Sequence, residues 1–327
     1  MAVGEAAPDA PSRQRFRPRR PVLPAALTGA KARVLLYRAG SRVVQLVPLP
    51  VVRAIAVAAG PVVAAAMPAR RAMVTRHLRR VLALEEPLSP EQRRSLRRAV
   101  RRSFASAARY WLESLRLPAL STPEVDAGLT REGYHHVEEG LRRGKGVILA
   151  LPHLGGWEWA GQWLGHHGLA PVVVVEPLEP LEVFAWFRSF RQSLGMDVVP
   201  LGPEAGTAVL RALRDNRIVC LLCDRDLQGG GVEVEFFGER TRLPAGPATL
   251  ALRTGAALVP AAVYFRGGLH VGVVRPPLVL EERTRLRDDV AVLTQRLATE
   301  LEELIRAAPE QWHLFQPNWP SDPGYRG

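Results

Sequence analysis

Short apolar runs alternate with amphipathic stretches from about residue 120 onwards. Val147–Leu151 is continuously apolar, which is typical of a strand buried on both faces, and Trp157–Leu164 follows with helical spacing. The alternation continues and predicts strands at Pro171–Val175, Ile218–Cys223, Val232–Phe237, Ala257–Phe265 and His270–Val274, and helices at Leu181–Leu194, Glu204–Arg214 and Asp288–Ala307. This order of elements predicts an α/β fold with a central, mostly parallel β-sheet flanked by helices.

The N-terminal third has a different pattern, which predicts helices. Pro90–Leu117 is the clearest, because one face is apolar and the other carries Arg93, Arg94, Arg97, Arg98, Arg101 and Arg102. Val43–Met67 is strongly apolar, but its longest uncharged run, Ala54–Ala69, has 16 residues, fewer than the roughly 20 that span a bilayer. The segment is interrupted by Pro48, Pro50 and the pair Gly60-Pro61, so it is either a helix lying in the membrane interface or a pair of core helices joined at a proline.

These changes in pattern divide the chain. Residues 1–23 are rich in proline and arginine and are expected to form a disordered basic arm. Residues 24–120 are expected to form a helical, basic, membrane-associating region, 121–320 the α/β core, and 321–327 a tail. We expect 24–320 to fold as one structural domain.

Charge is concentrated in the N-terminal third. Residues 1–120 contain 23 Lys and Arg against 6 Asp and Glu, whereas residues 121–327 contain 21 against 26, for a net charge of +12. A basic surface of this kind meets the phosphates of nucleic acid or of an anionic membrane, although an arginine face on a helix is as often only solvated. The 47% hydrophobic content excludes disorder over the whole length, and two cysteines exclude a disulfide scaffold.

A histidine stands where the first predicted strand ends, in Leu151-Pro152-His153-Leu154-Gly155-Gly156-Trp157-Glu158. The glycines permit a tight turn and close approach of a ligand, and a helix begins directly afterwards. A neutral imidazole at this place can accept a proton from a hydroxyl, and Glu158 can orient the ring or stabilise its charged form. The His-x4-acid spacing alone is weak, because about one match is expected by chance. The strand–turn–helix context favours a catalytic histidine over a buried structural one.

A second group of charges follows the strand Ile218–Cys223. Asp224-Arg225-Asp226 stands at the strand's end, and alternation within Val232–Phe236 places Glu233 and Glu235 on one face. Glu233 is then either a second partner for His153 or part of the solvated face of an edge strand. Cys220 and Cys223 have CxxC spacing but lie in a strand, where they point to opposite faces. We interpret them as structural, since the chain has no second pair to complete a zinc site.

Taken together, these residues resemble the bacterial lipid A lauroyl and myristoyl acyltransferases, and among them the actinobacterial phosphatidylinositol mannoside acyltransferases. The resemblance covers roughly residues 30–320. Its motifs are Arg109-Tyr110-Trp111 with Glu113, His153–Gly161, Phe187-Arg188 with Arg191, Asp224–Asp226 with Gly231–Gly238, Leu243–Ala248, and Trp312-His313 with Gln316-Pro317.

The resemblance implies transfer of a palmitoyl-like chain from acyl-CoA to a mannose hydroxyl of a phosphatidylinositol mannoside, at the cytoplasmic face of the membrane. It implies that His153 is the general base, that Glu158 belongs to the catalytic motif and that Glu233 pairs with His153. The substrate site is expected to include Trp157, Arg191, Asp224, Arg225 and Asp226, with Arg191 contacting phosphate or pantetheine. Acyl-CoA is a co-substrate in this reaction, and neither a metal nor another cofactor is expected.

Two other functions remain open on the sequence. One is acyl transfer to a different acceptor, as in lysophospholipid or lipid A-type acyltransferases. The other is nucleic-acid binding, which the basic arm and the arginine helix suggest. That function leaves His153–Gly161 unexplained, and only Phe16 and Tyr37 are available to stack on bases within residues 1–103. We therefore expect an anionic membrane surface, rather than nucleic acid, as the partner.

Overall fold

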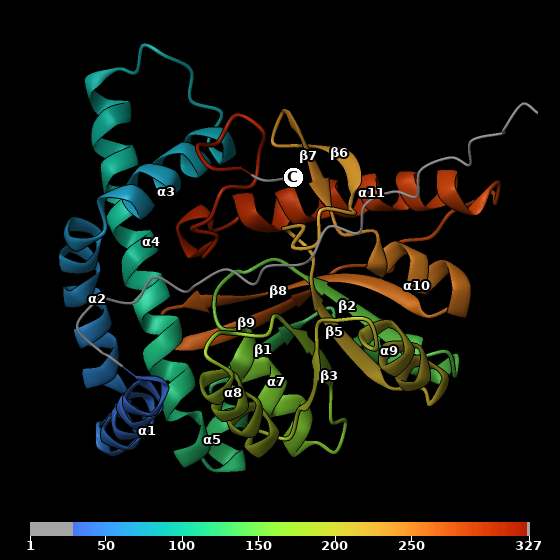
Figure 1. Ribbon diagram of the computed structural model, residues 1–327, viewed down its shortest axis with the longest axis horizontal. Helices are drawn as coiled ribbons and strands as arrows, with labels where there is room; N and C mark the ends of the chain where they lie inside the picture. The colour runs from blue at the N-terminus through green and yellow to red at the C-terminus, as the bar shows by residue number, and fades with distance from the viewer. Residues whose placement is uncertain (1–28, 326–327) are drawn as a thin grey trace, which may run out of the picture.

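The computed structural model describes residues 29–325. In this part of the chain, seven strands form one mostly parallel sheet with helices packed on both faces (Figure 1). The predicted α/β fold is thereby confirmed. In spatial order the strands are β1 (Leu129–Glu132), β9 (Leu269–Val274), β8 (Ala257–Arg266), β2 (Val147–Leu151), β5 (Ile218–Leu222), β3 (Val172–Val175) and β4 (Asp197–Pro200).

The hydrophobic core lies on both sides of the sheet because its central strands are apolar on both faces. Along β2, Ile148 and Ala150 pack into one buried cluster, whereas Val147, Leu149 and Leu151 pack into another. The first cluster is covered by α9 (Ala205–Arg214), α10 (Gly246–Thr254) and α11 (Leu286–Arg306). The second is covered by α5 (Thr122–Ala127), α6 (His135–Arg142), α7 (Trp157–His166) and α8 (Leu181–Ser193).

The register of two central strands determines where the charged residues meet. β2 and β5 pair in parallel, with Leu151 opposite Leu222. Because both strands run in the same direction, the residues that follow them leave the sheet at the same edge. His153 comes two residues after β2 and Asp224 two residues after β5, so the fold brings these side chains together.

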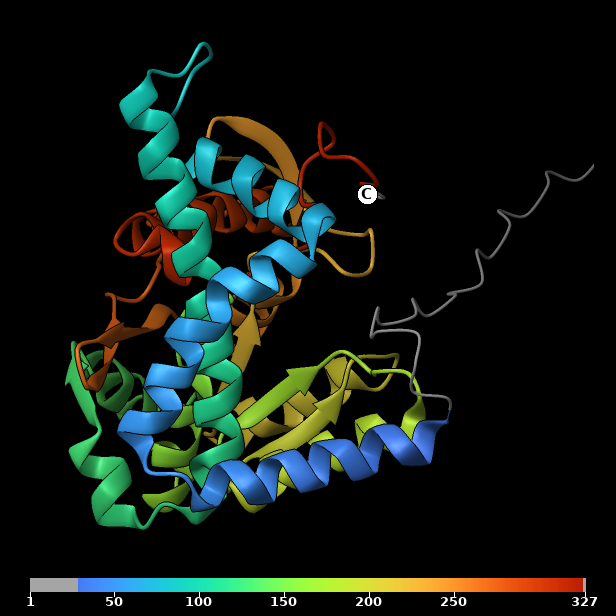
Figure 2. The ribbon, with the colours of Figure 1, turned by 90° about the vertical axis from the view of Figure 1, so that its left-hand side faces the viewer.

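Four helices lie along one side of the molecule (Figure 2): α1 (Ala30–Leu46), α2 (Leu49–Ala66), α3 (Pro68–Val81) and α4 (Pro90–Arg116). α4 begins at its predicted residue because Ser89 caps it. The Ser89 hydroxyl accepts a hydrogen bond from the backbone N–H of Gln92 at 3.1 Å, and the Gln92 side chain accepts one from the Ser89 N–H at 2.8 Å.

Within the apolar segment α1 ends at Leu46 and α2 begins at Leu49, so two helices meet at Pro48, whereas α2 itself continues through Gly60-Pro61. Gly60 packs so closely on α4 that a Cβ at this position would lie 2.7 Å from Ala105. This packing keeps the helix continuous despite the hydrogen bond that Pro61 cannot donate. By length and composition alone α2 is able to cross a bilayer, and 22% of its residues are buried in the protein.

β6 (Val232–Phe236) and β7 (Glu239–Leu243) form a separate antiparallel hairpin. The predicted strand at Val232–Phe237 therefore exists but does not join the main sheet. Val234 and Phe236 are buried in the cluster that α11 covers, whereas Glu233 and Glu235 are exposed. This orientation removes Glu233 from the edge of the sheet where His153 lies.

Several elements were not predicted from the sequence, and they are short. Examples are the four-residue strands β1 and β4 and the 3₁₀ turns Leu117–Ala119 and Pro309–Gln311. The predicted arm, residues 1–23, lies outside the described residues, as do residues 326 and 327 of the predicted tail. The domain boundaries at 24, 121 and 321 stay predictions.

Candidate active site

His153 and Asp224 form a hydrogen-bonded pair at the carboxyl edge of the sheet. His153 Nδ1 lies 2.7 Å from Asp224 Oδ1, and the His153 backbone N–H donates to Asp224 Oδ2 at 3.0 Å. Because an ionised carboxylate only accepts hydrogen bonds, Nδ1 carries the ring proton and Nε2 is the basic nitrogen. The His153 side chain is 30% exposed whereas that of Asp224 is fully buried. A substrate can therefore approach the histidine, whereas Asp224 is shielded from solvent.

The Asp224 carboxylate is kept ionised by the groups around it. Burial raises the pKa of Asp224, but the charge of His153 and hydrogen bonds from His153 and Trp312 hold the pKa below its usual value. Trp312 Nε1 donates to Asp224 Oδ2 at 2.7 Å. A buried anion that orients a histidine and stabilises its protonated form is the arrangement that a general base requires.

Glu158 pairs with Arg191, so the interpretation that it orients His153 is wrong. Glu158 Oε1 accepts hydrogen bonds from Arg191 Nε at 2.9 Å and Nη2 at 2.6 Å, and from the Tyr110 hydroxyl at 3.1 Å. α7 turns this carboxylate into the protein interior, where its side chain is 4% exposed. Tyr110 stacks on Trp157 with ring centroids 4.1 Å apart. Contact of Arg191 with a substrate phosphate stays a prediction.

We expect Glu158→Gln to lower the free energy of unfolding by about 3 kcal/mol, because it leaves the mostly buried Arg191 without a charged partner. Burial lowers the pKa of Arg191, but the Glu158 carboxylate more than offsets this effect. The net pKa is raised, so the guanidinium stays charged. Denaturant titration measures the loss. The control is Glu132→Gln, whose exposed pair with Arg266 is expected to contribute under about 1 kcal/mol. Equal losses in both variants would contradict the role given to the buried pair.

Glu233 is not the partner of His153, and this prediction is wrong. Its Oε1 accepts a hydrogen bond from Arg240 Nη1 at 3.0 Å, and the two side chains are 60% and 82% exposed. The alternation along β6 correctly places Glu233 opposite the apolar residues of that strand. Since the hairpin packs on α11 through its apolar face, the glutamate faces solvent. The solvated-edge interpretation is the one that the structure shows.

The residues after β5 have different tasks. Asp224 hydrogen-bonds His153, whereas Asp226 accepts hydrogen bonds from the backbone N–H groups of Gln228 at 3.0 Å and Gly231 at 2.7 Å. Asp226 therefore holds the glycine-rich loop that leads into β6. Arg225 is half-buried. Trp157 lies edge-on to His153, with ring centroids 5.9 Å apart. Its indole is therefore next to the His153 imidazole.

A second buried charged cluster lies behind the turn and joins α2, α4 and β9. Glu113 Oε1 accepts from Arg53 at 2.6 Å and from Arg109 at 2.7 Å, and its Oε2 lies 2.9 Å from His270 Nε2. Burial raises the pKa of Glu113, but these partners lower it to about 2. A Cβ on Gly156 would lie 2.5 Å from the His270 ring. The second glycine of the turn therefore permits this close approach.

Sequence reasoning gave no role to Trp312, His313 or His270. Trp312 and Asp224 are 88 positions apart, and His270 lies within a strand, so no local spacing could connect them with the histidine turn. The family resemblance included Trp312-His313 and was the signal that could have found them. Within residues 29–325, no group of three or more His, Cys, Asp or Glu side chains is arranged to hold a metal ion.

Comparison with known proteins identifies the class to which this site belongs. A profile of the bacterial lipid A biosynthesis acyltransferases matches residues 24–321. The chain belongs to this acyltransferase family, as the resemblance implied.

Individual relatives are more specific. A phosphatidylinositol mannoside acyltransferase of Mycobacterium tuberculosis (strain H37Rv) is 42% identical over 225 residues, which cover 67% of this chain and 70% of the relative. A protein of the same name from Mycolicibacterium smegmatis is 42% identical over 226 residues, which cover 68% of this chain and 73% of the relative.

Proposed function

We propose that this protein transfers a fatty acyl group from acyl-CoA to a mannose hydroxyl of a phosphatidylinositol mannoside, with His153 as the general base. The observation that carries the proposal is the pair formed by His153 and the buried Asp224, 2.7 Å apart at the edge of the sheet. The names of the relatives supply the acceptor, and membership in an acyltransferase family supplies the reaction type.

The reaction follows from the orientation of the histidine. His153 Nε2 accepts the proton of the acceptor hydroxyl while the oxygen attacks the thioester carbonyl. The tetrahedral intermediate collapses with formation of the ester C–O bond and cleavage of the C–S bond, and the imidazolium returns its proton to the departing thiolate. Asp224 stabilises the imidazolium during this cycle. Trp157, Arg191 and Arg225 are proposed to contact the acyl-CoA or the acceptor.

The test is release of free thiol from palmitoyl-CoA by the purified protein, measured with and without phosphatidylinositol mannosides. We expect release that depends on the acceptor, together with formation of an acylated glycolipid detected by mass spectrometry. Thiol release with a lysophospholipid or a lipid A precursor, but not with the mannoside, would show that the acceptor is that other lipid. No thioester cleavage with any acceptor would refute acyl transfer.

We propose that the protein works at the cytoplasmic face of the cell membrane, attached as a peripheral or monotopic protein. Two properties of the helical side in Figure 2 support this. Apolar side chains on α1 and α2 are exposed, among them Leu46 at 86%, Val57 at 66% and Val62 at 68%. The arginines on the polar face of α4 are also exposed. Apolar and basic surfaces together are typical of proteins that bind anionic bilayers.

Replacing three arginines of α4 is expected to weaken binding to vesicles that contain phosphatidylinositol. Each arginine near an anionic surface contributes about 1 kcal/mol, so Arg97→Gln, Arg98→Gln and Arg101→Gln combined should lower the partition coefficient roughly one-hundredfold at low salt. Vesicle sedimentation measures the loss. The matched control replaces Arg211, Arg214 and Arg253, which are exposed on α9 and α10 away from the N-terminal helices (Figure 1). Equal losses in both triple variants would contradict a specific membrane face.

A further inference from the structure

We infer that Trp312 is a positioning residue that acts through Asp224, and that the segment 311–322 holds both members of the catalytic pair in place. This inference rests on the proposed role of His153 as a base, and it adds a residue that neither the family resemblance nor the His-x4-acid motif assigns to catalysis. It is carried by three contacts that converge on the pair from one short segment.

Two of these contacts are made by the backbone. The segment after the 3₁₀ turn runs antiparallel to the histidine turn, with Trp312 opposite Leu154. The Gly155 N–H donates to the Gln311 carbonyl at 3.0 Å, and the His313 N–H donates to the His153 carbonyl at 2.7 Å. The backbone from the carbonyl of the reactive histidine to the glycine turn is therefore fixed by this segment.

The third contact is made by the indole. Trp312 is 3% exposed, and its Nε1 donates to the Asp224 oxygen that also accepts the His153 backbone N–H. Asp224 Oδ1 is thus left for the imidazole alone among these donors. Further along the segment, the Asn318 side chain donates to the Asp224 backbone carbonyl at 3.1 Å. The aspartate is held by its carboxylate and by its main chain from the same direction.

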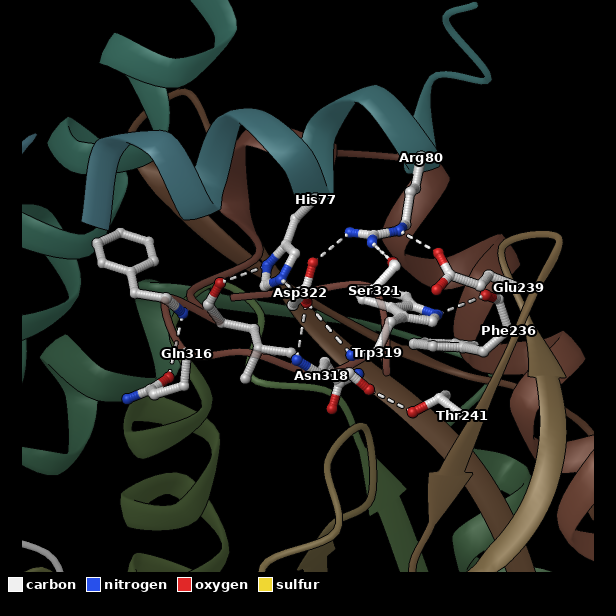
Figure 3. A network of polar contacts seen from close by, with 12 residues as sticks. His77, Arg80, Phe236, Glu239, Thr241, Gln316, Asn318, Trp319, Ser321 and Asp322 are labelled. Carbon is white, nitrogen blue, oxygen red and sulfur yellow. Dashed lines mark hydrogen bonds and ion pairs between the residues drawn. The ribbon is translucent and has the colours of Figure 1, made fainter. Parts of the chain in front are cut away.

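The segment is itself anchored to α3 (Figure 3). His77 of α3 lies between the Leu314 carbonyl, 3.0 Å from Nδ1, and Asp322 Oδ2, 3.2 Å from Nε2. Arg80 contacts Asp322 at 2.9 Å. The Asp322 carboxylate also accepts the backbone N–H groups of Asn318 and Trp319. These contacts make the segment a rigid support.

Removing the indole N–H has a defined consequence for the pair. The Asp224 carboxylate then loses one of its three donors, so its negative charge is shared less and it becomes a stronger acceptor for His153 Nδ1–H. Its position is also less fixed. We expect Trp312→Phe, which keeps the ring, to lower kcat about tenfold and to change KM less than twofold. The far-downfield NMR resonance of the His153 Nδ1 proton should move further downfield.

The matched control is Trp319→Phe. Trp319 is as deeply buried and belongs to the same segment, but its indole donates to the Phe236 carbonyl at 3.0 Å rather than to the catalytic pair. A general loss of packing or stability would affect both variants, whereas positioning of Asp224 predicts a change in kcat and in the Nδ1 resonance for Trp312→Phe alone. Equal changes in the two variants would overturn the inference.

A double-mutant cycle gives a second test. If Trp312 acts through the carboxylate, Trp312→Phe should change kcat less than twofold in the Asp224→Asn background. An undiminished tenfold loss in that background would overturn the inference. The NMR resonance is observed without substrate, so it reports on the positioning of His153 even if acyl transfer were refuted by the thiol assay. Failure of the two proposals is thereby distinguishable.

Discussion

Replacing His153 with glutamine is expected to lower acceptor-dependent acyl transfer by about 10³-fold, within the range by which a positioned general base accelerates a reaction. Glutamine has a similar volume and leaves intact the backbone N–H that donates to Asp224, but its amide cannot take the proton of the acceptor hydroxyl. The loss should appear in kcat with little change in KM. Steady-state thiol release from palmitoyl-CoA with a saturating mannoside acceptor measures it.

The control for this substitution is Glu233→Gln. Because Glu233 forms an exposed pair with Arg240 on the hairpin, we expect kcat to stay within twofold of the unmodified protein. The pair of results tests whether Glu233, which the sequence offered as a partner of the histidine, contributes to the reaction. An inactive Glu233→Gln together with an active His153→Gln would refute the site as described.

Asp224→Asn is expected to lower kcat by about 10²- to 10⁴-fold, because the amide can donate a hydrogen bond to the imidazole and favour the wrong tautomer. In the folded protein Asp224 accepts from His153 Nδ1, from the His153 backbone and from Trp312. An asparagine in either orientation loses part of this set. Kinetics of the variant, together with the Nδ1 resonance of His153, measure the effect.

Asp226→Asn is the matched control for Asp224→Asn, since it changes a carboxylate two positions away. The Asp226 carboxylate accepts hydrogen bonds from the backbone N–H groups of Gln228 and Gly231, so it supports the glycine-rich loop rather than the histidine. We expect its kcat to fall less than tenfold. A larger loss of kcat in Asp226→Asn than in Asp224→Asn would mean that the assignment of the two aspartates is reversed.

Much of the fold followed from local pattern. β2 is continuously apolar, α4 has a capping serine followed by a proline, and the structure has both elements where the sequence predicts them. The position of His153 at a strand end was equally evident. Its partner could also have been found, because Asp224 follows a second buried strand, and ends of adjacent parallel strands meet. What remained unknown was that β2 and β5 are neighbours.

The errors came from contacts that depend on tertiary structure. Alternation in β6 shows which residues share a face, but it does not show whether the strand belongs to the main sheet or to a hairpin. The sequence also does not show at which proline one helix ends and the next begins: the break is at Pro48, whereas α2 continues through Gly60-Pro61 with Gly60 packed against Ala105. Glu158 has the expected spacing from His153, but its carboxylate bonds Arg191 and Tyr110 instead. These partners come from other helices, so no pattern within α7 could indicate them.

The long sequence separations in the support of Asp224 affect the order in which this protein gains activity. His77 and Asp322 are 245 positions apart, and Trp312 is 88 positions from Asp224. Contacts between such distant positions close large loops, so they form late in folding, after helices and adjacent strand pairs. During synthesis, a nascent chain can complete all seven strands of the sheet before residues 311–322 emerge. Such a chain has His153 and Asp224 but lacks the support that aligns them, so the proposed acyl transfer is delayed until residues 311–322 have been made.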